Sequence, residues 1–382
     1  MGQPPGLRVA MLSHGGGGGS TRAAIDLAAA LGRAGHRVVL VTLGRPRWAL
    51  PRGLRGIVLT GRRPDARPLH AAWDRALVER IAREVAAICV SERISLLHFH
   101  YGLPFAAVAE TVRATLGVSG PAIVGTLHGS DITAAVRDPI QRRGLNQALA
   151  KADGVSTVSA AYGRLLQATL DLARPACVVP NFVPGAPSPP PPHRRPAPPV
   201  LLHVSSFRAV KDGRAVARIF LAVRRRMRCR LDLAGDGPDR RALRGLLRGH
   251  GGDVRFLGFR EDVPELLAGA DLLLLASRAE SFSLAALEAM AAGVPVVGPR
   301  VGGLPEVVGD GGLLFHPGRS ADAAAKVLAL LRAPLRRRRM AEAAQRRAGR
   351  FGEAAAVAGY EGLYRRALAR HASAAACAMD TL

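Results

Sequence analysis

The feature of this sequence that most constrains its fold is a series of short, unbroken apolar runs separated by longer segments of helical period. Unbroken runs rich in valine, leucine and isoleucine are typical of strands buried on both faces, as in parallel sheets. The segments between them supply the helical crossovers that parallel strands need. The sequence therefore predicts an α/β chain with two doubly wound parallel sheets. The expected strands are 7–13, 36–42, 56–60, 96–100, 122–128, 154–159 and 176–182, then 200–206, 230–235, 254–259, 271–277, 295–300 and 311–316.

A proline-rich segment divides these strands into two groups. Residues 184–199 cannot pair as a central strand, because proline has no backbone N–H and favours extended conformations. A chain of 382 residues is also long for one hydrophobic core. We therefore expect a first domain over 1–183, a linker over 184–199 and a second domain over 200–351. A last helix, at about 352–371, is expected to pack back on the first domain.

The charge is strongly basic, with a formal net charge of +25. Nearly all of the excess is arginine, since the chain contains only three lysines, Lys151, Lys211 and Lys326. Solvated helix faces and a compositional bias toward arginine explain this pattern, and so does an anionic partner such as a membrane surface or nucleic acid. Nucleic acid is the less favoured partner, because no interleaved aromatic residues or reader motif accompany the charge. A weak association with an anionic membrane remains an open interpretation.

Five consecutive glycines, at 15–19, follow the first expected strand and lead into a helix expected over 22–34. Glycine lets a backbone approach a ligand closely, and a helix N-terminus offers unpaired amides to an anion. No lysine follows the loop, which disfavours a P-loop that binds a nucleoside triphosphate. No acidic residue follows the second strand, which disfavours a dinucleotide cofactor. A flexible turn without a ligand is the alternative interpretation.

Two further loops carry charged residues at expected strand ends. Arg208 and Lys211 follow the first strand of the second domain, where a guanidinium fork and an ammonium could converge on one diphosphate. Glu280 and Glu288 stand eight residues apart on what we expect to be one helix, about 12 Å along its axis. That separation suits a nucleotide sugar, with one carboxylate at the sugar and the other at the ribose. Surface cations and a solvated helix face are the simpler alternatives.

These motifs, with Gly235-Asp236-Gly237-Pro238 and Gly302-Gly303-Leu304-Pro305-Glu306, resemble the retaining GT-B glycosyltransferases of family four over nearly the whole chain. The resemblance implies an acceptor-binding first domain and a second domain that binds the nucleotide sugar, both Rossmann-like. It implies that Glu280 holds the donor sugar, Glu288 the ribose, and Arg208 and Lys211 the diphosphate. The other donor contacts that it implies are Gly18, Gly19, Ser281, Phe282, Ser283 and Leu284.

The first domain has a narrower resemblance, carried by residues 98–104, 125–133 and 180–183. These segments are similar to the enzymes of bacillithiol biosynthesis that transfer N-acetylglucosamine (GlcNAc) from UDP-GlcNAc to the hydroxyl of L-malate. The similarity implies that His128 approaches the sugar and that the acceptor is bound by Ser20, Tyr101, Thr126 and Asn181. Two departures stand beside the donor loops, where Thr21 and Ser283 replace the glycines usual in that group. Packing roles are the alternative for Tyr101 and Thr126, a helix cap for Asp131, and an interior position for His98.

Retention of configuration, as the resemblance implies, lets the leaving diphosphate take the proton of the acceptor, so no dedicated carboxylate base is required. We expect no metal ion, because no pair of metal-binding carboxylates stands at a strand end. The four separated cysteines, Cys89, Cys177, Cys229 and Cys377, are expected to be reduced. A cytoplasmic enzyme is expected, since neither a signal pattern nor a long apolar stretch is present, and a homo-oligomer remains open. The enzyme alternative is a membrane-associated transferase with a lipid or polysaccharide acceptor.

Overall fold

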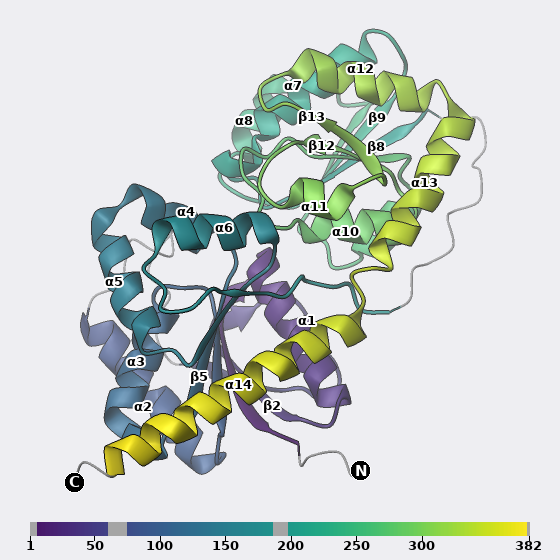
Figure 1. Ribbon diagram of the computed structural model, residues 1–382. Helices are drawn as coiled ribbons and strands as arrows, with labels where there is room; N and C mark the ends of the chain where they lie inside the picture. Colours follow the sequence, from purple (N-terminus) through teal and green to yellow (C-terminus); the bar gives the residue numbers. More distant parts are fainter. Residues whose placement is uncertain (1–5, 60–74, 186–197, 380–382) are drawn as a thin grey trace. The chain divides into compact units, whose positions relative to one another are not determined.

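The computed structural model describes residues 6–59, 75–185 and 198–379. The chain forms two compact units, one made of Met1–Asn181 with Glu353–Leu382 and the other of Phe182–Gly352. Each unit is an α/β layer structure around a parallel sheet, which confirms the predicted fold class (Figure 1). The proline-rich residues 186–197 lie outside the described residues.

Unit 1 contains a seven-stranded parallel sheet in the order β3-β2-β1-β4-β5-β6-β7. The strand order reverses between β1 and β4, as in a doubly wound fold. Its strands are β1 (Arg8–Gly16), β2 (Arg37–Pro46), β3 (Arg55–Leu59), β4 (Leu96–His100), β5 (Ala122–Leu127), β6 (Gly154–Thr157) and β7 (Cys177–Val178). Its helices are α1 (Gly19–Arg33), α2 (Arg75–Ser91), α3 (Phe105–Leu116), η1 (Gly117–Ser119), α4 (Ser130–Arg137), α5 (Pro139–Ala150), α6 (Ala160–Thr169) and α14 (Glu353–Met379).

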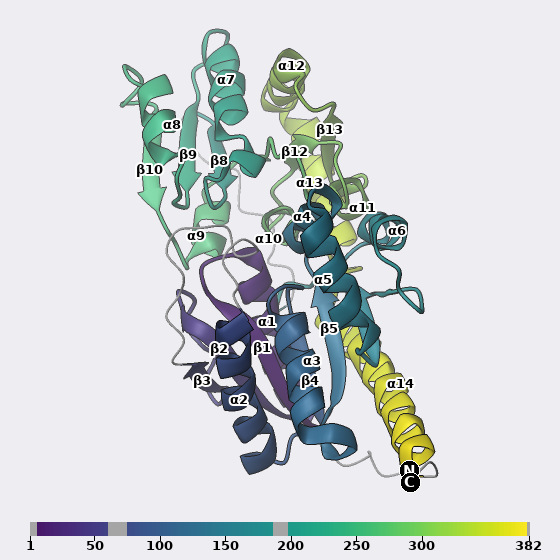
Figure 2. The same ribbon diagram turned by 90° about the vertical axis from the view of Figure 1, so that its left-hand side faces the viewer.

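The helices of unit 1 cover both faces of its sheet, which explains why the strands are apolar on both sides. One core cluster joins α2, α3 and α5 to side chains of β1, β2, β4 and β5. Helix α14 contacts β5, β6 and α1 instead, and Figure 2 shows β5 between α3 and α14 (Figure 2). The last helix of the chain is therefore part of the first unit.

Unit 2 contains a six-stranded parallel sheet in the order β10-β9-β8-β11-β12-β13. Its strand order reverses between β8 and β11. The strands are β8 (Val200–Val204), β9 (Arg230–Ala234), β10 (Val254–Gly258), β11 (Leu272–Leu274), β12 (Val296–Pro299) and β13 (Gly312–Phe315). The helices are η2 (Ala209–Lys211), α7 (Gly213–Arg224), α8 (Arg240–Leu246), α9 (Val263–Ala268), α10 (Leu284–Ala291), α11 (Leu304–Val308), α12 (Ser320–Leu331) and α13 (Pro334–Ala348).

Helices α7, α8 and α12 share one core cluster with the sheet of unit 2, while α10 contacts α11 and α13. Helix α7 shows how the sequence produces this arrangement. Its apolar residues recur at helical spacing and are buried, and the Asp212 carboxylate caps the helix by accepting from the amide of Ala215 at 3.0 Å. The cap fixes the start of α7 directly after Lys211.

Candidate active site

In unit 2, the loops that follow β8 and β11 lie on either side of the point where the strand order reverses. Parallel strands point the same way, so both loops leave the carboxyl edge of the sheet, where open α/β sheets bind ligands. The first loop contains Arg208 and Lys211, and the second contains Glu280. The topology therefore brings Lys211 and Glu280 together although they are 69 residues apart in sequence.

Glu280 is the centre of this cluster. Its carboxylate oxygen Oε1 accepts from the Lys211 ammonium at 2.7 Å and from the Ser277 hydroxyl at 2.7 Å. Glu280 is only 6% exposed, and Lys211 is half-buried, so this ion pair is partly shielded from water. Both hydrogen bonds end on Oε1, which leaves Oε2 as the oxygen available to hydroxyl donors of a ligand.

The expectation that Glu280 and Glu288 share one helix is wrong. Helix α10 begins at Leu284, so Glu280 lies in the loop before it and Glu288 lies within it. The helical estimate of their separation therefore does not apply. The loop conformation has a physical reason, because the Glu280 carboxylate is turned inward to Lys211 and Ser277 rather than continuing a helix.

The two loops of unit 2 are also tied together directly. The backbone N–H of Arg278 donates to the carbonyl of Val210 at 2.8 Å, and the Arg278 guanidinium pairs with Asp212 at 3.0 Å. The carbonyl of Glu280 accepts from the amide of Gly303, the residue directly before α11. The sequence pattern did not indicate the roles of Ser277, Arg278 and Asp212, although each stands within three residues of Lys211 or Glu280.

A buried histidine links β8 to β11 beneath these loops. His203 Nδ1 lies 2.8 Å from the carbonyl of Leu274, which can only accept, so this nitrogen carries the proton. His203 Nε2 therefore accepts from the Ser205 hydroxyl at 2.8 Å, and Ser205 Oγ accepts from the amide of Phe207. Burial lowers the pKa of His203 to about 4, so the ring is neutral at pH 7.

Two glycines hold a neighbouring loop against the Arg208 loop. A Cβ at Gly235 would lie 1.7 Å from the carbonyl oxygen of Ser205, and one at Gly237 would lie 2.1 Å from that of Ser206. Both glycines also have positive φ, 127° and 158°. Only glycine allows this approach, which explains the Gly-x-Gly part of the motif at 235–238 in terms of packing.

The remaining donor residues have different environments. Arg208 is exposed and makes no ion pair with any residue that the structure describes. Ser281, Leu284 and Glu288 are half-buried. Phe282 is 2% exposed and packs edge-on against Phe351, with ring centroids 5.5 Å apart, so its side chain faces the interior of unit 2 rather than a ligand.

Ser283 adopts the left-handed conformation that favours glycine. Its φ is 82° and its ψ is 85°, and its hydroxyl accepts from the amide of Ala286 at 3.4 Å to cap α10. The backbone here retains the conformation that glycine would adopt, although a serine occupies the position. Serine at this position therefore has a less favourable backbone conformation than glycine would have.

In unit 1, the glycine-rich loop begins inside β1 rather than after it, and α1 begins at Gly19 rather than near Arg22. Gly15 lies against the backbone of β2, where a Cβ would be 2.2 Å from the carbonyl oxygen of Gly44. Gly18 has no atom within 4 Å of an added Cβ, and no side chain caps α1. Packing within unit 1 therefore explains Gly15 but does not explain Gly18.

Asp131 fixes the loops after β4 and β5. Its buried carboxylate accepts from the backbone amides of Gly102, His128, Gly129 and Ile132 at 2.6 to 3.1 Å. Burial raises the pKa of Asp131, and the four amide hydrogen bonds oppose that shift. Asp131 therefore joins the loops after β4 and β5 through hydrogen bonds, a larger role than the helix cap suggested by the sequence.

Thr126 is completely buried, which contradicts the expected contact with the acceptor in this conformation. Its hydroxyl lies 2.7 Å from His98 Nε2, 2.7 Å from the Ser156 hydroxyl and 3.3 Å from the Tyr360 hydroxyl. His98 Nδ1 lies 2.8 Å from the Tyr364 hydroxyl, so the expected interior position of His98 is confirmed. Strand β5 and helix α14 are thus joined by a polar network inside unit 1.

Tyr101 and His128 lie directly after β4 and β5, at the carboxyl edge of the sheet. Tyr101 is 4% exposed with φ 91°, and its hydroxyl accepts from Ser130 Oγ at 3.1 Å. His128 is half-buried, and its Nε2 lies 2.9 Å from Nδ1 of the buried His100. Burial lowers the pKa of His128 to about 4, so this imidazole is a neutral hydrogen-bonding group at pH 7.

Ser20 and Asn181 are both half-buried, Ser20 in the first turn of α1 and Asn181 shortly after β7. In the part of the chain that the structure describes, no cluster of three or more metal-ligating side chains occurs. None of the described helices is long and apolar enough to span a bilayer. Cys89, Cys177 and Cys229 are free thiols, and the side chain of Cys377 lies outside the described residues.

The chain belongs to glycosyltransferase family 4 and has the GT-B fold. Residues 17–185 match the family described as "Glycosyltransferase Family 4", and residues 198–333 match "Glycosyl transferases group 1". The N-acetyl-alpha-D-glucosaminyl L-malate synthase of Bacillus anthracis is 31% identical over 94% of this chain and 96% of its own length. The alpha-D-kanosaminyltransferase of Streptomyces kanamyceticus is 34% identical over 44% of this chain and 45% of its own length.

Solved structures are similar over the whole fold. Sucrose-phosphate synthase from Thermosynechococcus elongatus has a TM-score of 0.78 at 22% identity, covering 95% of this chain and all of that one. Anabaena HepE, crystallised with UDP and glucose, has a TM-score of 0.75 at 20% identity, covering 93% of this chain and 98% of that one. These structures support the fold, and the family match makes the protein a glycosyltransferase.

Proposed function

We propose that this glycosyltransferase transfers GlcNAc from UDP-GlcNAc to the hydroxyl of L-malate, with retention of configuration. The observation that carries the proposal is the 31% identity to the B. anthracis malate synthase along almost the entire length of both chains. The product would be the GlcNAc-malate conjugate of bacillithiol biosynthesis, formed in the cytoplasm.

The donor is assigned to the cluster of unit 2. Arg208 is exposed and without an ion-pair partner in the described part of the chain, so its guanidinium is available to a diphosphate. Lys211 supplies a second positive charge from the same loop, held by Glu280. Glu280 Oε2 accepts from the sugar hydroxyls, and Glu288 on α10 accepts from the ribose. Two side-chain cations meet the charge of the diphosphate, so we propose a reaction that needs no metal ion.

The acceptor is assigned to the carboxyl edge of unit 1. The first turn of α1 has no side-chain cap, so its amides can bind a carboxylate of malate, with Ser20 beside them. Asn181 contributes an amide, and Gly18 leaves room for the sugar. Tyr101 and Thr126 support this edge from inside rather than touching malate.

The reaction requires alignment and charge stabilisation more than a separate base. The bond between C1 of GlcNAc and the UDP oxygen breaks, and the malate oxygen bonds to C1 on the same face. The proton of the malate hydroxyl passes to the diphosphate oxygen that leaves. Arg208 and Lys211 stabilise the charge on that oxygen, and neutral His128 donates or accepts a hydrogen bond at the sugar without adding charge.

The test is the release of UDP from UDP-GlcNAc with L-malate present and absent, followed by NMR of the anomeric proton of the product. We expect malate-dependent release and an α-linked product. Release that does not respond to malate would reject the acceptor and leave the glycosyltransferase class intact. A β-linked product would reject retention. Release that persists unchanged in excess EDTA is expected, and its loss would reject metal independence.

A second candidate acceptor, a lipid at an anionic membrane, is favoured by one surface of unit 2. Helix α13 exposes Leu335 to 75% and places Arg336, Arg338 and Arg339 at the surface nearby. An apolar residue among arginines is a pattern that binds anionic bilayers. Salt-sensitive binding to vesicles containing phosphatidylglycerol, together with transfer to a lipid acceptor, would support this candidate against malate.

A further inference from the structure

A pocket lies in unit 1 away from the carboxyl edge of the sheet. Its walls come from the end of α5, the residues leading into β6, the segment before β7 and helix α14. Asp153 and Gly154 mark the amino end of β6, so the pocket opens at the amino edge, and none of the proposed acceptor residues lines it. Its cavity volume is about 90 Å³, and the space around it is open to solvent.

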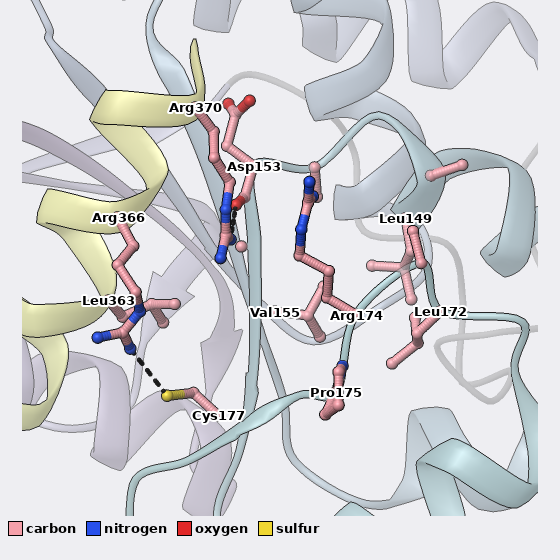
Figure 3. Close-up of a pocket in the computed structure, with 14 residues that line it drawn as sticks. Leu149, Asp153, Val155, Leu172, Arg174, Pro175, Cys177, Leu363, Arg366 and Arg370 are labelled. Carbon is pink, nitrogen blue, oxygen red and sulfur yellow. Dashed lines mark hydrogen bonds between the residues drawn. The ribbon is translucent and has the colours of Figure 1, made fainter. Parts of the chain in front are cut away.

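Three arginines line this pocket. Arg366 and Arg370 extend from α14, and Arg174 comes from the segment before β7 (Figure 3). Arg366 donates to the sulfur of Cys177 at 3.1 Å, and Arg370 donates to the backbone carbonyl of Asp153 at 2.7 Å. Among the described residues, no carboxylate forms an ion pair with any of the three.

The one acidic residue in the lining is already engaged elsewhere. The Asp153 carboxylate accepts from the Arg113 guanidinium at 2.5 Å and from the backbone amide of Ile123 at 2.7 Å. The pocket is therefore lined by three guanidinium groups that have no carboxylate partner in its walls, and one of them, Arg366, is turned toward Cys177 (Figure 3). Guanidinium groups bind phosphoryl and carboxylate oxygens through paired hydrogen bonds, so an anion is the expected occupant.

We propose that this pocket binds the phosphoryl group of a small phosphorylated metabolite. The guanidinium groups come from two different chain segments, which suits a tetrahedral dianion with acceptor oxygens in several directions better than a flat carboxylate. Apolar walls, including Val155 and Leu363, can receive the carbon part of such a molecule. The site is separate from the proposed donor and acceptor residues, so it goes beyond the proposed function.

Binding would have a structural consequence through α14. The helix that carries Arg366 and Arg370 also carries Tyr360 and Tyr364, which bond to the Thr126 and His98 network on the sheet. A phosphoryl group held between Arg174 and α14 would fasten this helix more firmly to unit 1. Ligands that bind only the folded state raise its stability, so the melting temperature of the protein should rise with phosphate.

The test uses Cys177, which lines the pocket, as a reporter that is independent of enzyme activity. Alkylation of Cys177 by iodoacetamide is followed by peptide mass spectrometry in inorganic phosphate, glycerol 3-phosphate or succinate, against chloride at equal ionic strength. We expect alkylation to slow about tenfold when a phosphate compound is at ten times its dissociation constant. The melting temperature should rise in parallel.

The variant for the test is R174Q/R366Q, which changes two exposed side chains. The matched control is R365Q, an exposed arginine on the same helix that does not line the pocket. Protection by phosphate that is lost in R174Q/R366Q and kept in R365Q supports the site. No protection, equal protection in both variants, or stronger protection by succinate than by either phosphate compound would overturn it. Far-UV circular dichroism at the assay temperature verifies that the double variant is folded.

Discussion

The Lys211 ammonium lies 2.7 Å from Oε1 of Glu280, and the two residues come from loops that follow different strands. A partly shielded ion pair of this kind holds a cation in one place before any ligand arrives. In the proposed reaction, the same cation then faces the diphosphate, so the pair connects sugar recognition to stabilisation of the leaving group.

Replacing Lys211 by alanine should lower kcat at saturating donor by about a hundredfold or more, because an ordered positive charge would be lost where the diphosphate develops charge. Steady-state UDP release measures this. Lys326→Ala is the control, since Lys326 also forms an ion pair, with Asp322 on α12. Near-normal turnover of Lys211→Ala at saturating donor would exclude the proposed role.

Glu280→Gln and Glu288→Gln should differ in what they impair. Glu280→Gln should reduce the preference for UDP-GlcNAc over UDP-glucose, because its carboxylate is proposed to accept from the sugar hydroxyls. Glu288→Gln should weaken the binding of UDP by about tenfold, the loss expected for one charge-assisted hydrogen bond. Inhibition by UDP and competition between the two donors separate these effects, and identical profiles for both variants would contradict the assignment.

Gly235→Ala should destabilise unit 2 by about 3 kcal/mol or more, because its Cβ would overlap the carbonyl oxygen of Ser205 and its φ is positive. Gly245→Ala is the matched control. Gly245 lies exposed within α8 and has open space around an added Cβ, so alanine should stabilise that helix by up to about 1 kcal/mol. Urea unfolding followed by circular dichroism should give shifts of opposite sign.

Ser283→Gly should stabilise unit 2 by about 1 kcal/mol. Glycine removes the cost of a left-handed backbone, whereas losing the serine cap for glycine costs only a few tenths of a kcal/mol. Thermal unfolding measures the difference. A lower melting temperature for Ser283→Gly would mean that the serine hydroxyl stabilises the folded state by more than the left-handed backbone destabilises it.

Stability should fall as the pH drops from about 6.5 toward 4. His203 has its pKa lowered to about 4 by burial, so in this window the unfolded chain binds a proton that the folded chain does not. One such histidine contributes up to about 3 kcal/mol of this loss. His98 and His128, with lowered pKa values of about 3 and about 4, act in the same direction.

Comparing melting temperatures at pH 7.5 and pH 5 in the wild type and in His203→Gln tests this dependence. The variant should have a lower melting temperature at pH 7.5. Its melting temperature should also fall less between pH 7.5 and pH 5, because it lacks one of the titrating groups. An equal loss in both proteins would show that His203 does not contribute.

The fold class could be predicted because unbroken apolar runs of this length, bounded by turn residues, are typical of buried parallel strands. Each expected strand overlaps an observed one. The loop path around Glu280 could not be predicted, since it depends on Lys211 and Ser277, one of which is 69 residues away. From the spacing of the motif alone, we expected the helix that contains Glu288 to include Glu280 as well. The helix actually starts after Ser283, whose left-handed backbone and hydroxyl cap mark its first turn.

The interior position of Thr126 could not be predicted from the sequence either. A threonine near a strand end looks available to a ligand, but its surroundings include Tyr360, 234 residues further along the chain. Nothing in the local pattern around Thr126 indicates that a distant helix covers it. Asp131 was underestimated for a similar reason, because three of its four amide partners, Gly102, His128 and Gly129, lie outside helix α4.

The return of α14 to unit 1 has a consequence for how the protein is made. Residues 182–352 form a unit of their own and emerge from the ribosome before Tyr360 and Tyr364 do. During translation, unit 2 can complete its core while the nascent unit 1 still lacks the hydroxyl partners of His98 and Thr126. The first unit to be synthesised is thus the last to be finished.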